Sequence, residues 1–266
     1  MKFIELLKYI FLSIIQGVGE ILPISSSGHL LLFRKILNIN IEGVSLEITL
    51  HIASLVALFI YYKRTILDLI KGFIGYVLKK DKIYVREYKF VMGMIICLIP
   101  TCFIGFIVND YLDYFFKYSL VVGIFLILNG INLLLIKNNE GKKCVEEMSF
   151  FSFFKIGLGQ CLGLVPGFSR SGSALSMCYR EKMNKEDSEK FTFLMLFPLV
   201  LGSLVLNIGD FTIESNLNVL LMISFIVTFI VTFLSLGLLS KIVRKGKLYY
   251  FSYYCIIIGV LVILVN

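Results

Sequence analysis

The sequence predicts an all-α integral membrane protein, and three observations lead to this fold class. Of the 266 residues, 58% are hydrophobic and only 17% are charged, whereas a soluble domain has about 25% charged residues. The mean hydropathy is +0.88. Several apolar runs approach the roughly 20 residues that a helix needs to cross a bilayer. We therefore expect a single polytopic membrane domain over residues 1–266.

The charge and cysteine content narrows the class of protein further. The formal net charge is +8, but the basic residues cluster between apolar runs, where they report membrane orientation and contact with anionic lipid. We therefore expect membrane lipids, and no nucleic acid, as partners. None of the six cysteines forms a C-x-x-C pair and only two histidines are present, so no zinc spacing appears. The N-terminus has no cleavage-site pattern and is read as mature chain.

Two apolar stretches are interrupted by serine-glycine loops, namely Tyr9–Leu32 and Phe150–Tyr179. Such breaks in matching positions of two halves point to a midplane site made of broken helices. Three candidate spans follow each stretch, in the order Leu46–Tyr62, Phe90–Val108 and Ser119–Ile136, then Phe191–Ile208, Leu217–Ser240 and Leu248–Val265. Within the basic connection between the first two spans, Ile66–Leu78 is expected to form a short amphipathic helix on the membrane surface.

The loop charges orient these elements. Basic residues crowd 63–89, 137–143, 180–190 and 241–247, whereas 109–118 and 209–216 are acidic or nearly neutral. The positive-inside rule places the basic set and Lys79–Arg86 in the cytoplasm, with both termini outside. Threading the spans then makes both interrupted stretches re-entrant, from opposite faces. External positions for Arg34 and Lys35 count against this arrangement.

The resulting prediction is an inverted repeat of approximately 1–136 and 150–266. Each half has one re-entrant helix-loop-helix hairpin plus three transmembrane helices, and the two loops meet near the midplane. Irregular backbone at that depth is tolerated where it is buried in protein or lines a wet cavity. The alternative is eight full spans with kinks.

The first interrupted stretch places a carboxylate at membrane depth. Gln16 and Glu20 are four residues apart, so they share one face of a helix that Pro23 ends. A carboxylate beside a phosphate-binding loop suits a divalent cation, because Mg²⁺ takes one or two carboxylates with substrate oxygens and water. Glu20 is the predicted metal ligand, and Gln16 is a weaker candidate.

The turn after this helix is a candidate phosphate site. Its backbone N–H groups can point at one spot, and a half-helix beginning near His29 adds its positive end. The turn consists of Ser25, Ser26, Ser27 and Gly28.

The second interrupted stretch supplies an arginine. Arg170 lies between Ser169 and Ser171, and Gly172 follows. A guanidinium is always charged and matches phosphate oxygens in a bidentate way, and the two hydroxyls add donors. A carboxylate, a hydroxyl, an imidazole and an arginine together suit phosphoryl transfer, where catalysis is mostly positioning and charge neutralisation.

Each feature also has a structural interpretation. Serine-glycine pairs in membrane helices often only allow close packing. His51 is more often a hydrogen-bonded interior histidine than a catalyst, although Glu47, four residues earlier, could share a polar face with it. Glu20 and Arg170 could form a purely structural ion pair. A bare charge at membrane depth is costly, however, so these two residues favour a functional site.

At this point the pattern resembles a known family. The chain is similar to the bacterial undecaprenyl-diphosphate phosphatases, also called bacitracin-resistance proteins, over nearly its whole length. One signature is a Glu/Gln-x-x-x-Glu helix running into Leu-Pro-x-Ser-Ser-Ser/Thr-Gly-His-Leu, seen here from Gln16 to Leu30. The other is Pro-Gly-x-Ser-Arg-Ser-Gly, seen here from Pro166 to Gly172. The stretch Leu46–Leu55 also looks like the family's segment after the first loop.

The resemblance implies an activity and a location. It implies hydrolysis of undecaprenyl diphosphate to the monophosphate, which recycles the lipid carrier of cell-wall synthesis and confers bacitracin resistance. It implies a bacterial plasma membrane, an active site open to the extracytoplasmic side, and a divalent cation, with Mg²⁺ expected and Ca²⁺ an alternative. A polyprenyl diphosphate lipid is then the substrate. A homodimer is left open.

The resemblance also assigns roles. Glu20 matches the metal-associated glutamate. Ser26 and His29 match residues of the nucleophilic and proton-transfer steps, and which of them attacks phosphorus stays open. Arg170, with Ser169 and Ser171, matches the diphosphate-binding loop.

Two positions depart from the family pattern. Gln16 stands where many members have a glutamate, which argues against a metal site with two carboxylates. Ser173 and Ala174 follow Gly172 where Ala-Thr is common.

A second functional class fits the same pattern. A transporter or flippase of polyprenyl phosphates could also use an inverted repeat around a midplane site. It would need a phosphate-binding Arg170, but no nucleophile beside a carboxylate. Phosphate release from a polyprenyl diphosphate discriminates between the two classes.

Overall fold

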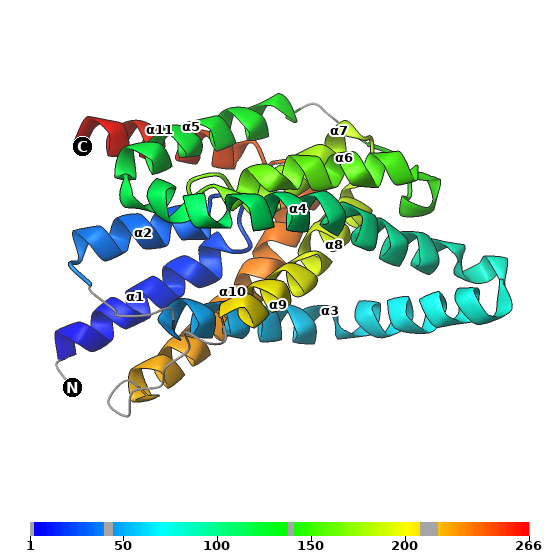
Figure 1. Cartoon of the computed structure of the whole chain (residues 1–266), viewed down its shortest axis with the longest axis horizontal. Helices are drawn as coiled ribbons and strands as arrows, with labels where there is room; N and C mark the ends of the chain where they lie inside the picture. The colour runs from blue at the N-terminus through cyan, green and yellow to red at the C-terminus, as the bar shows by residue number, and fades with distance from the viewer. Residues whose placement is uncertain (1–2, 40–44, 138–140, 208–217, 266) are drawn as a thin grey trace.

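The computed structural model describes residues 3–39, 45–137, 141–207 and 218–265, which form a helical body (Figure 1). The prediction of an all-α protein is confirmed for these residues. The α-helices are α1 Phe3–Gly19, α2 Ser26–Ile36, α3 Ser45–Lys79, α4 Val85–Lys117, α5 Ser119–Leu135, α6 Phe150–Gln160, α7 Arg170–Arg180, α8 Lys185–Leu194, α9 Leu196–Asn207, α10 Asn218–Arg244 and α11 Tyr250–Val265. Short 3-10 turns are η1 Lys82–Tyr84, η2 Val145–Glu147 and η3 Cys161–Leu164.

Three helical segments are long and apolar enough to cross a membrane. They are Ser45–Lys79, Lys82–Val108 and Val219–Arg244. Shorter apolar helices cover Ser119–Leu135, Phe150–Leu164 and Tyr250–Val265. Large apolar side chains on the outside, such as Phe103, Phe106 and Leu264, are exposed as lipid-facing residues are expected to be. These features are those of a multi-pass membrane protein.

Each interrupted stretch forms a pair of short helices. The helices α2, α6 and α7 have 11 residues each, about 17 Å at 1.5 Å per residue, and cannot cross a bilayer core of about 30 Å. Helix α1 packs against α2, and α6 packs against α7. The chain therefore doubles back at both serine loops, which does not fit eight full spans.

The prediction of a separate surface helix at Ile66–Leu78 is wrong. Helix α3 continues without a break to Lys79, and its last turns pack on the start of α4. Phe73 and Tyr76 both stack on Tyr88, and a Cβ on Gly72 would lie 2.5 Å from the Glu87 side chain. This close helical contact, which amphipathicity alone does not reveal, extends α3 into a hairpin with α4.

The expected span Phe191–Ile208 is not one helix. Helix α8 ends at Leu194, and α9 begins at Leu196. Pro198, in the first turn of α9, has no N–H to donate to Leu194 and would clash with its carbonyl, which explains the break. Ile208, Leu217 and the loop 209–216 lie outside the described residues.

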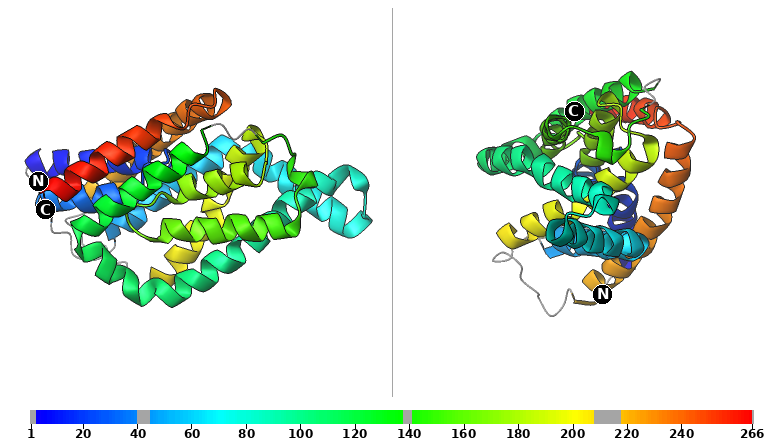
Figure 2. Two further views of the ribbon diagram at one scale, coloured as in Figure 1. Left: turned by 90° about the horizontal axis from the view of Figure 1, so that it is seen from above. Right: turned by 90° about the vertical axis from the view of Figure 1, so that its right-hand side faces the viewer.

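The two ends of the body carry different segments. The first turn of α1 and the last turn of α11 lie at one end, and the tip of the α3–α4 hairpin lies at the other (Figures 1 and 2). Helices α1 and α2 occupy the first end, whereas α6 approaches the centre from the second (Figure 1). The two serine loops therefore meet in the interior.

Candidate active site

Direct hydrogen bonds join the two loops. The Gly167 N–H donates to the Ser25 hydroxyl oxygen at 3.1 Å. Asn129, a fully buried residue of α5, donates from Nδ2 to the Pro23 carbonyl at 2.9 Å and accepts from the Ser169 N–H at 3.3 Å. One amide thus ties both loops to the same helix.

Matching N-caps shape the two loops. The Ser25 hydroxyl accepts from the Gly28 N–H at the start of α2, and the Ser169 hydroxyl accepts from the Gly172 N–H at the start of α7. Serine is a preferred N-cap because its oxygen satisfies an N–H that the helix leaves unpaired. Ser25 adopts a φ of 69°, a region that costs energy for residues other than glycine. The first residue after each cap is Ser26 in α2 and Arg170 in α7.

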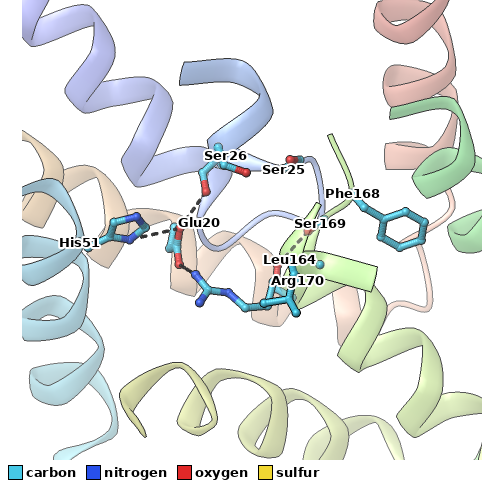
Figure 3. Close-up of a pocket in the computed structure, with 12 residues that line it drawn as sticks. Glu20, Ser25, Ser26, His51, Leu164, Phe168, Ser169 and Arg170 are labelled. Carbon is cyan, nitrogen blue, oxygen red and sulfur yellow. Dashed lines mark hydrogen bonds and ion pairs between the residues drawn. The ribbon is translucent and has the colours of Figure 1, made fainter. Parts of the chain in front are cut away.

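Glu20 lies at the centre of the site (Figure 3). Its Oε1 accepts from Arg170 Nη2 at 2.9 Å, and its Oε2 accepts from the Ser26 hydroxyl at 2.8 Å and from Gln16 Nε2 at 3.1 Å. The Glu20 side chain is 3% exposed and the Arg170 side chain is 25% exposed. The pair is therefore buried on the carboxylate side and open on the guanidinium side.

A polar cavity of about 230 Å³ opens beside this pair. Such a volume suits a diphosphate head group better than a drug-sized ligand, whose pockets occupy about 300–1,000 Å³. Its lining is drawn in Figure 3 and consists of Gly19, Glu20, Ser25, Ser26, Ser27, His51, Gly163, Leu164, Phe168, Ser169, Arg170 and Ser171.

Most of the predicted site residues converge on this cavity. Glu20, Arg170 and five of the predicted serines line it. Gly28 and Gly172 do not line it, and their N–H groups are held by the N-caps. A Cβ on Gly28 would lie 2.9 Å from the Gly167 nitrogen, so glycine there allows the loops to touch.

Among the four predicted catalytic residues, His29 is the one that neither lines the cavity nor contacts Glu20. Its Nδ1 lies 2.8 Å from the Ser25 carbonyl oxygen, and its Nε2 lies 3.0 Å from the Tyr254 hydroxyl, with the two rings stacked. A carbonyl only accepts, so Nδ1 carries the proton and Nε2 accepts from Tyr254. Both ring nitrogens are occupied away from Glu20.

Two residues that sequence reasoning did not assign to the site contact its residues. His51, interpreted as an interior histidine, lines the cavity, and its Nδ1 is 3.3 Å from Gln16 Nε2 and 3.8 Å from Glu20 Oε2. Glu47 pairs with Arg34 instead of sharing this site. Asn129 was missed, although it is one of two amides, with Asn132, inside the apolar run Ser119–Ile136, and polar side chains at that depth are a usable signal.

The residues around Glu20 fit a divalent cation. They offer one carboxylate, and the buried Gln16 Oε1 has no hydrogen-bond partner among the described residues. One carboxylate with neutral oxygens and substrate phosphate is a donor set that Mg²⁺ accepts. A second group, Cys144, Glu146 and Asp187, also has metal-ligand spacing. There, however, Arg86 and the Val145 N–H already occupy the Asp187 carboxylate.

Comparisons with known proteins place the chain in a family. The family model for the bacitracin resistance protein BacA matches residues 9–261. Undecaprenyl-diphosphatase 2 of Bacillus thuringiensis (strain Al Hakam) is 37% identical over 266 residues, covering 99% of this chain and 98% of the relative.

Two further relatives cover the chain as fully. Undecaprenyl-diphosphatase 1 of Bacillus licheniformis is 36% identical over 99% of both chains. Undecaprenyl-diphosphatase of Oceanobacillus iheyensis is 33% identical over 99% of this chain and 98% of the relative. With a matching model over almost all of its length and relatives above 30% identity, the chain belongs to the BacA family.

Proposed function

We propose that this protein is a membrane-embedded phosphatase that hydrolyses undecaprenyl diphosphate to undecaprenyl phosphate and phosphate. One observation carries the proposal. The Ser26 hydroxyl is 2.8 Å from a buried carboxylate whose other oxygen is 2.9 Å from Arg170, at the wall of a polar cavity inside an apolar body. The names of the relatives supply the substrate.

Arg170 binds the substrate in this proposal. Its guanidinium is partly exposed to the cavity and offers several donors besides the one that Glu20 accepts. The helix that it begins also presents backbone N–H groups and a partial positive charge to an anion. The terminal phosphate therefore docks against Arg170 and the start of α7.

Ser26 is the nucleophile in this proposal, and Glu20 accepts its proton. The hydrogen bond between them gives the proton a path as Oγ bonds to the terminal phosphorus. The bond from that phosphorus to the bridging oxygen breaks, and undecaprenyl phosphate leaves. Water then hydrolyses the phosphoserine and releases phosphate. Ser26 is preferred to His29 because both His29 nitrogens are occupied elsewhere.

A divalent cation held by Glu20 and Gln16 would supply charge neutralisation for the phosphate oxygens. Glu20 can contact Arg170 and a cation at the same time, because Arg170 contacts Oε1 while Oε2 faces Gln16 and Ser26. We expect Mg²⁺ or Ca²⁺ in the simplest form of this site.

His29 holds the loop in this proposal. Its Nδ1–H supports the carbonyl of Ser25, the residue that also accepts from Gly28 and Gly167. Tyr254 fixes the ring from α11. His29 is then a positioning residue for the turn that presents Ser26.

We also infer that residues 1–136 and 150–266 form inverted repeats in a bacterial plasma membrane, with the cavity open to the extracytoplasmic side. The matching order of elements and the positive-inside pattern support this topology. Single cysteines at Asn38 and Lys80, in a cysteine-free background, should react with an impermeant thiol reagent from opposite faces. Reaction of both from one face would contradict the inverted repeat.

The same proposal places the protein in lipid-carrier recycling and bacitracin resistance, as the family description suggests. The activity itself is tested by phosphate release from undecaprenyl diphosphate by the purified protein in detergent, with Ser26→Ala as the control. We expect release by the wild type and essentially none by the variant. Binding of the lipid without release by the wild type would favour the transporter class instead.

A further inference from the structure

Three potential ligand atoms lie close together beside the cavity, which Glu20 and His51 line. One of them belongs to a residue without a role in the proposed reaction. Gln16 comes from α1, Glu20 follows that helix, and His51 comes from the second turn of α3. Glu20 Oε2 lies 3.1 Å from Gln16 Nε2 and 3.8 Å from His51 Nδ1, and the third separation, between Gln16 Nε2 and His51 Nδ1, is 3.3 Å.

This triangle has the size of one face of a coordination shell. Two ligands about 2.1 Å from a cation at right angles lie about 3.0 Å apart, and ligands at about 2.5 Å lie about 3.5 Å apart. Two of the three separations fall in this interval. The His51–Glu20 separation of 3.8 Å would enter it after a movement of roughly 0.3 Å.

The Gln16 side chain can complete the triangle with an oxygen. As described, its NH₂ group donates toward Glu20 and contacts His51, while Oε1 is buried and has no partner among the described residues. A half-turn of the amide exchanges the two atoms and points the oxygen at the other two ligands. Carboxamide oxygen and nitrogen are close in shape, so the rotation needs no repacking.

His51 is accessible as well as close. Its side chain is 31% exposed and lines the cavity beside Ser26. Imidazole binds metals through a ring nitrogen without a proton, and Nδ1 is the His51 ring nitrogen that faces Gln16 and Glu20. Arg170 contacts the other oxygen of Glu20, so it does not block Oε2.

We propose that His51 Nδ1 is a ligand of the divalent cation at this site, together with Glu20 Oε2 and the Gln16 amide oxygen. The inference rests on the proposed function only in taking the cavity as a cation-dependent phosphate site. A nitrogen ligand shifts the preference of a site from Mg²⁺ and Ca²⁺ toward first-row transition metals. Mn²⁺ accepts carboxylate, carbonyl and water oxygens as Mg²⁺ does and also binds imidazole, so it is a suitable paramagnetic probe of this mixed set.

The experiment uses Mn²⁺ alone as the probe, on the full chain in detergent with an affinity tag that contains no histidine. Electron spin-echo spectroscopy detects the ¹⁴N of an imidazole bound to Mn²⁺. Because the chain has two histidines, His29→Asn leaves His51 as the only imidazole and serves as the matched control. We expect the imidazole signal in the wild type and in His29→Asn, and its loss in His51→Gln.

Affinity gives a second readout. Bound Mn²⁺, counted by electron paramagnetic resonance, should require about tenfold more free Mn²⁺ in His51→Gln, and Mg²⁺ should displace it more easily. Glu20→Gln should abolish the bound population. The His29→Asn measurement decides the question even if His51→Gln does not fold.

Three results would overturn the proposal: Mn²⁺ bound through Glu20 without an imidazole signal, a signal that survives in His51→Gln, or binding unaffected by Glu20→Gln. The first result would make the Gln16–His51 contact a structural hydrogen bond. None of these measurements needs turnover. An imidazole signal in a protein that releases no phosphate would therefore refute the phosphatase function and leave the cation site intact.

Discussion

The two helix-loop-helix pairs share a backbone arrangement but differ in the residue that begins the second helix. In both, a serine N-cap accepts from a glycine N–H three residues later. The next residue is Ser26 in the first pair and Arg170 in the second. The first pair also carries Glu20, whereas the second carries no acid in its loop. In the proposed function, the first pair supplies the nucleophile with its base, and the second pair supplies the guanidinium that binds phosphate.

The comparison teaches that neither pair can act alone. A serine at a helix start in a membrane protein often only packs, and a buried carboxylate without a partner is costly. In the proposed function, Ser26 and Glu20 become reactive only because Arg170 meets Glu20 across the contact between the loops. Changes at the two first-turn positions should therefore fail in different ways.

Ser26→Ala tests the first pair and should have the largest effect. Loss of the attacking hydroxyl removes the covalent route, and we expect phosphate release to fall by roughly 10³-fold or more. The measurement is single-turnover phosphate release. A separate binding measurement should show that the variant binds the substrate as tightly as the wild type does. Ser27→Ala, the neighbouring cavity serine without a contact to Glu20, is the control and should remain far more active.

Arg170→Lys tests the second pair. Lysine keeps the charge but loses the planar donor fork, so kcat/KM should fall by about 10²-fold. Steady-state kinetics should show a higher KM and a lower kcat, because Arg170 holds the phosphate before and during its transfer. Near wild-type kinetics would show that Arg170 supplies only charge.

Asn129→Ala breaks the connection between the pairs. Loss of this buried amide leaves the Ser169 N–H without its partner and the Pro23 carbonyl with only the weak Cys255 thiol donor at 3.8 Å, which should destabilise the protein by about 1–3 kcal/mol. We expect a lower thermal midpoint in detergent together with a fall of about tenfold in kcat. Asn132→Ala is the matched control, because Asn132 is on the same helix and contacts Ser176 and Arg180 instead of the loops.

His29→Asn should have the smallest effect of the four. If His29 only supports the Ser25 carbonyl, kcat should fall by about tenfold or less, and Tyr254→Phe should act through the same contact. The double variant should then be little worse than His29→Asn alone. A loss as large as that of Ser26→Ala would restore His29 to the chemical step.

The sequence predicted which residues meet at Glu20 better than which residues support them. Glu20, Ser26 and Arg170 could be found because charges and broken helices at membrane depth need a reason. The sequence could not show that His51 lines the cavity while His29 does not. These placements depend on Tyr254 and Gln16, which reach the two rings from other helices. Helical periodicity fixes which residues share a face, but not which distant side chain meets them.

In the fold too, some features could be predicted from the sequence and others could not. Apolar length placed the cores of α3, α4, α5, α10 and α11, because burial in lipid requires such runs. The continuation of α3 beyond Tyr62 depends on its packing against α4, and the break after α8 depends on Pro198. Helix packing decides the continuation of α3, and a local steric clash decides the break after α8. Hydropathy reports neither packing partners nor steric clashes.

The central claim is that a side chain of the first pair attacks a phosphate held by the second. Hydrolysis of undecaprenyl diphosphate made chiral at its terminal phosphorus with oxygen isotopes and sulfur tests this claim most directly. Two successive in-line displacements, first by Ser26 and then by water, predict overall retention of configuration in the released thiophosphate. Inversion would mean that water attacks the substrate directly, and it would contradict the assignment of Ser26 as the nucleophile.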